Sequence, residues 1–104
     1  MQPAREVVRV DLQLSFHLYG CVPVQAEGEV AGHRFYFRAR GDAWTFGVAR
    51  TSDVAPVDVF CPEHGFFRGG DYGSDEFDAS YMPFDDAEAI VCRCAAEFIA
   101  GIET

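Results

Sequence analysis

The feature that most constrains this chain is an unbroken alternation of apolar and polar residues between positions 8 and 18. Each even position there is apolar: Val8, Val10, Leu12, Leu14, Phe16 and Leu18. Polar residues occupy the odd positions between them. Successive side chains of a β-strand point to opposite faces of a sheet, so a period of two predicts one long strand with one buried face.

The same alternation continues downstream, and turn residues set the register of the strands. Gly20 predicts a turn after the first strand, while Ala31-Gly32 and Gly41-Asp42 predict two more. The last two turns predict these cross-strand partners on the inner face: Val24 with Ala39, Ala26 with Phe37, Gly28 with Phe35, Ala39 with Trp44, Phe37 with Phe46 and Phe35 with Val48. Because the hairpins agree on one apolar face, they support each other's register.

Near the C-terminus the apolar period changes from two to that of a helix. The apolar residues there are Ile90, Val91, Cys94, Ala95, Phe98 and Ile99. Asp85 followed by Glu88 has the spacing of a capping box, and Gly101 is a plausible helix end.

These patterns predict a single α+β domain over residues 1–104. It is an antiparallel β-meander of four to five strands with one C-terminal α-helix packed on its inner face. The fifth strand is expected at Val57–Phe60. The expected core comprises Leu12, Leu14, Phe35, Phe37, Trp44, Phe46 and Phe98.

The formal charge of −9 limits the classes of partner. Free nucleic acid and anionic membranes would be repelled, which leaves basic protein surfaces and cations. No apolar run reaches the ~20 residues that span a bilayer, and no signal peptide is recognisable. We therefore expect a cytoplasmic protein whose four cysteines are free thiols.

Three cysteines and one histidine could form a zinc site: Cys61, His64, Cys92 and Cys94. In a helix, however, residues i and i+2 lie about 200° apart, so Cys92 and Cys94 cannot easily share one metal ion. No oriented nucleophile and base can be identified, and catalytic motifs are absent. We expect no metal, no cofactor and no catalytic residue. The alternative is a small-molecule-binding domain or enzyme with a pocket near Cys61, His64 and Arg68.

The segment from Gly69 to Asp86 contains six acidic residues, four aromatic residues and no basic one. Aromatic anchors among charges are typical of protein interfaces. We predict that the partner-binding residues are Asp71, Tyr72, Asp75, Glu76 and Asp78. The simpler alternative is a connecting loop in which Phe77, Tyr81 and Phe84 plug one end of the core. A second candidate surface is the outer sheet face, with Arg9, Gln13, His17, Glu27 and Tyr36.

Two stretches, FYFRARGDAWTFGVA (35–49) and FDASYMPFDDAEAIVCRCAAEFI (77–99), resemble segments of small uncharacterised acidic proteins of bacteria and their phages or mobile elements. In size and charge the chain is similar to anti-CRISPR and anti-restriction inhibitors. The resemblance implies no catalytic residues. It implies a small acidic binding protein that occupies a basic nucleic-acid-binding surface of its partner, without binding nucleic acid itself. The oligomeric state stays open.

Overall fold

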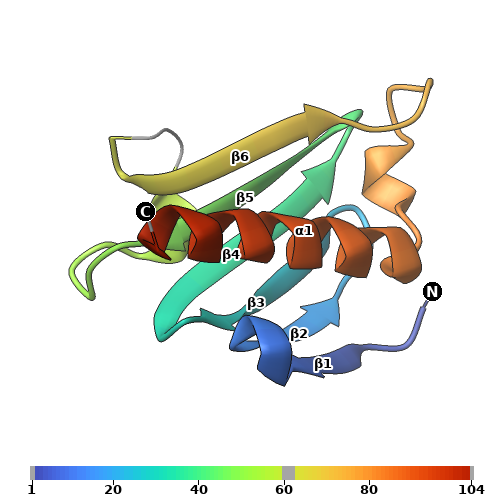
Figure 1. Cartoon of the computed structure of the whole chain (residues 1–104). Helices are drawn as coiled ribbons and strands as arrows, with labels where there is room; N and C mark the ends of the chain where they lie inside the picture. The colour runs from blue at the N-terminus through green and yellow to red at the C-terminus, as the bar shows by residue number, and fades with distance from the viewer. Residues whose placement is uncertain (1, 60–62, 104) are drawn as a thin grey trace.

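The computed structural model describes residues 2–59 and 63–103, with side chains described as far as residue 101. It consists of one antiparallel sheet in the order β1-β2-β3-β4-β5-β6, with a single α-helix across one face (Figure 1). The elements in chain order are β1 (Arg5–Arg9), η1 (Val10–Leu12), β2 (Leu14–Tyr19), β3 (Val24–Val30), β4 (His33–Arg40), β5 (Ala43–Ala49), η2 (Pro56–Asp58), β6 (Gly65–Asp71), η3 (Ala79–Tyr81) and α1 (Phe84–Glu103). The α+β class and the C-terminal helix on one face are confirmed. The sheet has six strands rather than four or five.

The two central hairpins have the predicted register. Residue 28 lies opposite 35, 26 opposite 37 and 24 opposite 39. The following hairpin places 35 opposite 48, 37 opposite 46 and 39 opposite 44. Cross-strand partners face the same side, so the large rings of β4 and β5 gather under the helix.

The prediction of one strand over residues 8–18 was wrong. β1 and β2 are separate antiparallel strands joined by η1, and Gln13 adopts a left-handed φ of 49° at the junction. Val7 is buried opposite Phe16, whereas Val8 and Val10 are 70% and 85% exposed. The apolar alternation runs through this turn without a break. It misled the prediction because Val8 and Val10, which belong to the pattern, are exposed at the edge of the sheet. Leu12, expected in the core, is only partly buried.

The segment predicted as a fifth strand is also different. Pro56–Asp58 forms a short 3₁₀-helix, and Phe60 is outside the described residues. Val59 is buried on the outer sheet face, where a Cβ added at Gly47 would lie 2.9 Å from the Val59 Cβ. Glycine at position 47 therefore lets this segment pack directly on β5. The sixth strand is formed by the glycine-rich segment Gly65–Asp71, which pairs with β5.

The helix begins two residues earlier than the capping-box spacing predicts, since Asp85 as N-cap would make Asp86 the first helical residue. Its first residue is Phe84, whose amide donates to Gln2 Oε1 at 2.8 Å, while Gln2 Nε2 donates to Met82 O at 3.2 Å. Asp85 and Glu88 both accept hydrogen bonds from Arg5 instead of forming a capping box. Gly101 does not end the helix, which continues to Glu103. No helix in the described part of the chain is both long and apolar enough to cross a membrane.

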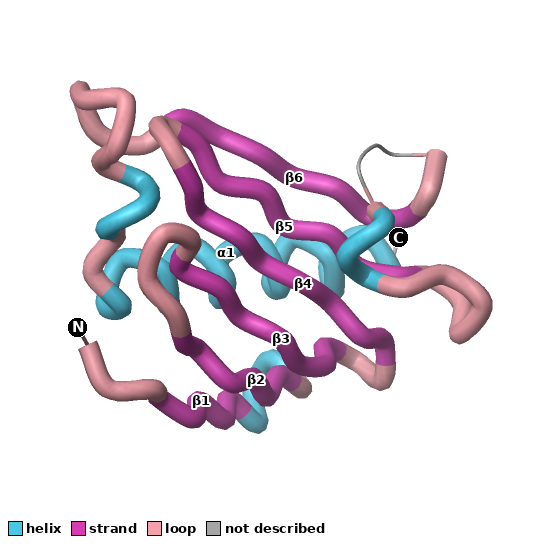
Figure 2. Tube along the Cα trace, turned by 180° about the vertical axis from the view of Figure 1, so that it is seen from behind, coloured by secondary structure: helices cyan, strands magenta, loops and turns pink. Residues whose placement is uncertain are grey.

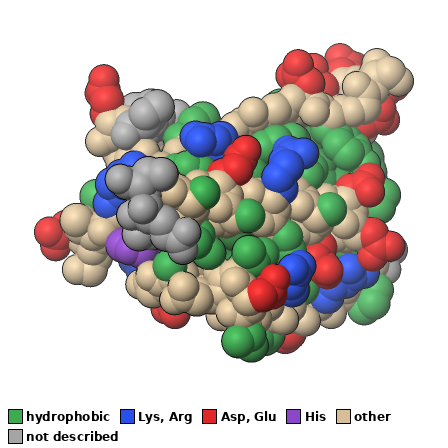
Figure 3. Space-filling view, viewed as in Figure 1, with side chains coloured by type: hydrophobic (Ala, Val, Ile, Leu, Met, Phe, Trp, Pro, Cys, Tyr) green, Lys and Arg blue, Asp and Glu red, His purple; other side chains and the backbone are tan. Residues whose placement is uncertain are grey.

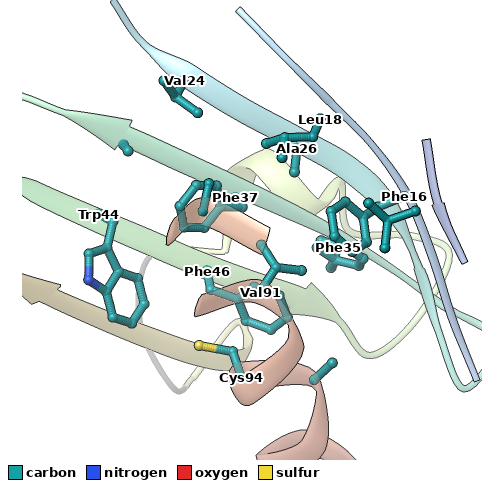
Figure 4. Packing of buried hydrophobic residues seen from close by; sticks show 14 of the residues in the cluster. Phe16, Leu18, Val24, Ala26, Phe35, Phe37, Trp44, Phe46, Val91 and Cys94 are labelled. Carbon is teal, nitrogen blue, oxygen red and sulfur yellow. The ribbon is translucent and has the colours of Figure 1, made fainter. Parts of the chain in front are cut away.

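The core lies between the helix and the inner sheet face (Figure 4). Phe35, Phe37 and Phe46 are at most 1% exposed, and Trp44 is 6% exposed. The helix contributes Val91 and Cys94, among others. Burial raises the pKa of the Cys94 thiol to about 11, so this cysteine behaves as a small apolar residue rather than as a thiolate.

Candidate functional site

The acidic segment after β6 forms a loop that projects from one corner of the molecule (Figure 1). Both ends of the loop are attached to the turn between β4 and β5. The Tyr72 amide donates to Asp42 O at 2.8 Å, and the Ala79 amide donates to Gly41 O at 2.9 Å. In return, the Gly41 amide donates to the buried Ser80 Oγ at 2.7 Å. Hydrogen bonds to the β4–β5 turn thus hold both ends of the loop.

Two of the predicted binding residues give the loop its shape. Asp78 Oδ2 accepts hydrogen bonds from the Ser74 amide at 2.8 Å and the Asp75 amide at 3.0 Å. Asp75 Oδ1 accepts one from the Phe77 amide at 2.9 Å. Asp75 and Asp78 therefore already have structural partners, as is usual for aspartates in turns.

The other two acidic residues of the predicted set are free. Asp71 and Glu76 are exposed, and neither carboxylate forms a hydrogen bond or ion pair with another described residue, although Asp71 is paired with Ala43 in the sheet. None of the ion pairs between described residues brings an arginine to the loop. Acidic side chains accordingly gather on this projection, on the face that Figure 3 shows.

The aromatic residues of the segment are arranged differently from expectation. Tyr72 is half-buried against the core, and its hydroxyl donates to Asp86 Oδ2, which raises the pKa of Tyr72 to about 12. Phe84 is buried as predicted. Phe77 and Tyr81 do not plug the core: they are 58% and 63% exposed. Sequence spacing could not separate these cases, because η3 and its flanking turns have no regular apolar period.

The described residues of the possible zinc site and of the alternative small-molecule pocket have separate surroundings. Cys61 is outside the described residues and His64 is exposed. Arg68 lies on the helix side, with its guanidinium carbon 4.2 Å from the Phe66 ring centroid and its Nε 3.4 Å from Glu97 Oε2. Cys92 Sγ lies 3.8 Å from Arg9 Nη1, away from the buried Cys94. In residues 2–59 and 63–103, no three His, Cys, Asp or Glu side chains gather as a metal-binding group.

The outer sheet face, opposite the helix, contains part of the second candidate surface (Figure 2). His17 pairs with Glu6 and stacks on Tyr19 with ring centroids 5.2 Å apart. Burial and the nearby Glu27 carboxylate raise the pKa of Tyr19 to about 12.

Two residues predicted for this surface lie elsewhere. Arg9 is opposite Leu14, on the helix side, and is bound to Asp11. Gln13 is in the turn before β2. The turn shifts the inward-facing positions from odd numbers in β1 to even numbers in β2. Arg9 therefore faces the helix side, and Gln13 lies in the turn itself.

Comparison of this chain with protein-family models, curated proteins and solved structures finds no match.

Proposed function

We propose that this protein is a small acidic binding protein of the inhibitor type, and that its projecting loop occupies a basic, nucleic-acid-binding surface of a partner protein. The observation that carries the proposal is the combination of unpaired acids and exposed aromatic rings on one anchored loop and the ends of the two elements that flank it, Asp71 at the end of β6 and Tyr81 at the end of η3. Asp71 and Glu76 supply charge, and Phe77 and Tyr81 supply apolar anchors. Aromatic rings are among the residues that protein interfaces favour as anchors, and acidic side chains complement a basic partner surface.

The net charge of −9 supports the same partner class. A protein surface that binds phosphates is positively charged, and it attracts an acidic protein over a distance of about 10 Å at 0.1 M salt. An anchored loop also loses little conformational freedom on binding. Tyr72 and Asp78, part of the predicted binding set, support the loop from within.

The test uses two charge reversals, Asp71→Lys with Glu76→Lys, because neither carboxylate holds the fold. The matched control is Asp53→Lys with Glu63→Lys, which changes the net charge equally at exposed positions outside the loop. Each protein is immobilised and exposed to a bacterial lysate. Proteins retained by the wild type are then purified and their affinities measured, with a DNA duplex as competitor.

We expect the loop reversal to abolish binding of a retained protein, the control to keep most of it, and DNA to compete. Phe77→Ala with Tyr81→Ala should mainly accelerate dissociation. Equal binding by the loop reversal and the wild type, or binding that DNA does not affect, would contradict the proposal.

An enzyme or small-molecule binder with a pocket near Cys61, His64 and Arg68 is the alternative prediction. Arg68 is engaged by Glu97 and Phe66, and this arrangement does not favour the alternative.

A further inference from the structure

A groove on the outer sheet face lies between the sheet and the η2 segment, which packs in front of β4 and β5 (Figure 2). It has two adjoining hollows of about 510 and 190 Å³ that share Tyr36, Pro56 and Val57 as walls. The larger hollow is within the size range of small-molecule sites, roughly 300–1,000 Å³. Apolar side chains from η2 form one wall, and strand residues form the other.

One of the side chains that line the smaller hollow has a buried donor without an acceptor. Its lining includes Arg38, which lies opposite Thr45 on β5. Arg38 Nε is buried and has no hydrogen-bond partner among the described residues. An unpaired buried donor costs about 1–3 kcal/mol, more for a charged group, so an acceptor supplied by a ligand would remove a real penalty.

The next residue along the same face forms no hydrogen bond with Arg38 Nε. Tyr36 donates its hydroxyl to Gln25 Oε1 at 2.6 Å, and Gln25 is the residue opposite Arg38 on β3. Asp58 also lines the smaller hollow, yet no ion pair joins it to Arg38. The Nε–H of this lining side chain is therefore unused.

The larger hollow has an excess of acidic side chains, whereas in the smaller one Asp58 balances the charge of Arg38. Glu27 and Glu29 line it together with one cation, Arg34, which lies opposite Glu29. This leaves an excess negative charge near Glu27. Glu27 and Arg38 are diagonal neighbours across β3 and β4, a relation that separates Cβ atoms by about 7–8 Å. An ammonium group is therefore favoured near Glu27, while the unpaired donor at the other end of the groove is suited to an acceptor such as a carboxylate.

We propose that this groove binds a small zwitterion, an amino acid or related aminocarboxylate with an apolar middle. Its carboxylate accepts from Arg38, its ammonium group lies near Glu27, and its body packs against Tyr36, Pro56 and Val57. Charge-assisted hydrogen bonds at both ends select the orientation. The site is on the sheet face opposite the helix and uses none of the residues assigned to the projecting loop.

The test is an NMR titration with three probes of matched shape. They are 4-(aminomethyl)benzoate, which is zwitterionic, 4-methylbenzoate, which is only anionic, and 4-methylbenzylamine, which is only cationic. We expect the zwitterion to bind about tenfold or more tightly than either analogue. It should shift the Arg38 Nε–H signal and the amides of Tyr36, Thr45 and Val57.

Two variants separate the ends of the ligand. Arg38→Gln should reduce the affinity for the zwitterion to that for the amine, and Glu27→Gln should reduce it to that for the methylbenzoate. Arg40→Gln, on the same strand but outside the groove, is the control and should change nothing. If either groove variant unfolds, Val57→Arg blocks the groove from an exposed position and should abolish all three titrations.

Equal affinity for the three probes, shifts confined to other residues, or no saturable shift up to about 10 mM would overturn the proposal. Failure of the proposed loop function is recognised separately. Asp71→Lys with Glu76→Lys should leave the probe titration unchanged, whatever its effect on a protein partner.

Discussion

The indole of Trp44 shows how one glycine can decide the packing of an aromatic ring. Trp44 lies opposite Gly70 on β6, and a Cβ added at Gly70 would lie 2.9 Å from three atoms of the indole. Such a contact is too short without a shift of the rigid ring. Glycine at this edge-strand position therefore gives the indole its place in the core.

Trp44→Ala should lower the free energy of unfolding by about 3–5 kcal/mol, because it removes a large buried side chain. Gly70→Ala should also destabilise the wild type. In a Trp44→Ala background the Gly70→Ala change should cost much less, because the clashing ring is gone. Urea unfolding of the four proteins measures this coupling, and strictly additive effects would contradict the packing described here.

The Tyr72 hydroxyl makes stability depend on alkaline pH. Its hydrogen bond to Asp86, aided by burial, raises the pKa of Tyr72 from 10.0 to about 12. The raised pKa means that the folded state holds this proton more tightly than the unfolded state. The stabilisation is therefore complete below pH 10 and is lost as the pH rises toward 12.

Tyr72→Phe should consequently reduce the loss of stability between pH 10 and 12. Thermal unfolding midpoints of the variant and the wild type across this range provide the measurement. Tyr81→Phe, at an exposed position, is the matched control and should behave like the wild type. An unchanged pH profile in the Tyr72 variant would show that the hydrogen bond to Asp86 does not form.

At the scale of secondary-structure elements, the N-terminal segment and the helix depend on one another. Gln2 accepts the hydrogen bond of the first helical amide, and Arg5 on β1 pairs with Asp85 and Glu88 of α1. The helix start is thus capped by a residue some eighty positions earlier in the chain. A local capping motif was the natural prediction, but the acidic residues of that motif already bind Arg5.

Gln2→Ala should lower the free energy of unfolding by about 1 kcal/mol, as the loss of a helix cap usually does. Hydrogen exchange should accelerate in the first turn of α1 more than in β3 and β4. Thr51→Ala, in an exposed loop, serves as the control. Equal exchange rates at Phe84 in wild type and variant would exclude the capping role.

At the scale of the whole molecule, charge opposes folding. Seventeen acidic residues stand against eight basic ones, and self-repulsion of this kind destabilises a compact state. The five ion pairs between described residues involve only three of these basic residues, Arg5, Arg9 and Arg68, together with His17, and none reaches Asp71 or Glu76.

Added sodium chloride should therefore raise the thermal unfolding midpoint, because it screens repulsion between exposed charges. The increase should be smaller for Asp71→Lys with Glu76→Lys, which carries less net negative charge. Calorimetry at low salt and at about 0.5 M salt tests both statements. A midpoint that falls with salt, or an equal response of the two proteins, would contradict them.

The local sequence pattern determined the structure of the three central strands, β3, β4 and β5. The alternation, the glycine turns and the size-matched pairs between β3, β4 and β5 specify a face and a register, because both depend on neighbours along two short hairpins. The helical period of residues 90–99 likewise depends only on local spacing.

Contacts between distant segments determined the features that local spacing leaves open. These features include the turn at Gln13, the pairing of the glycine-rich β6 beside Trp44, and the capping of α1 by Gln2. The same contacts also left Tyr72 half-buried and Phe77 and Tyr81 exposed, and they buried the Nε of Arg38, since contacts between distant segments determine where such side chains can lie.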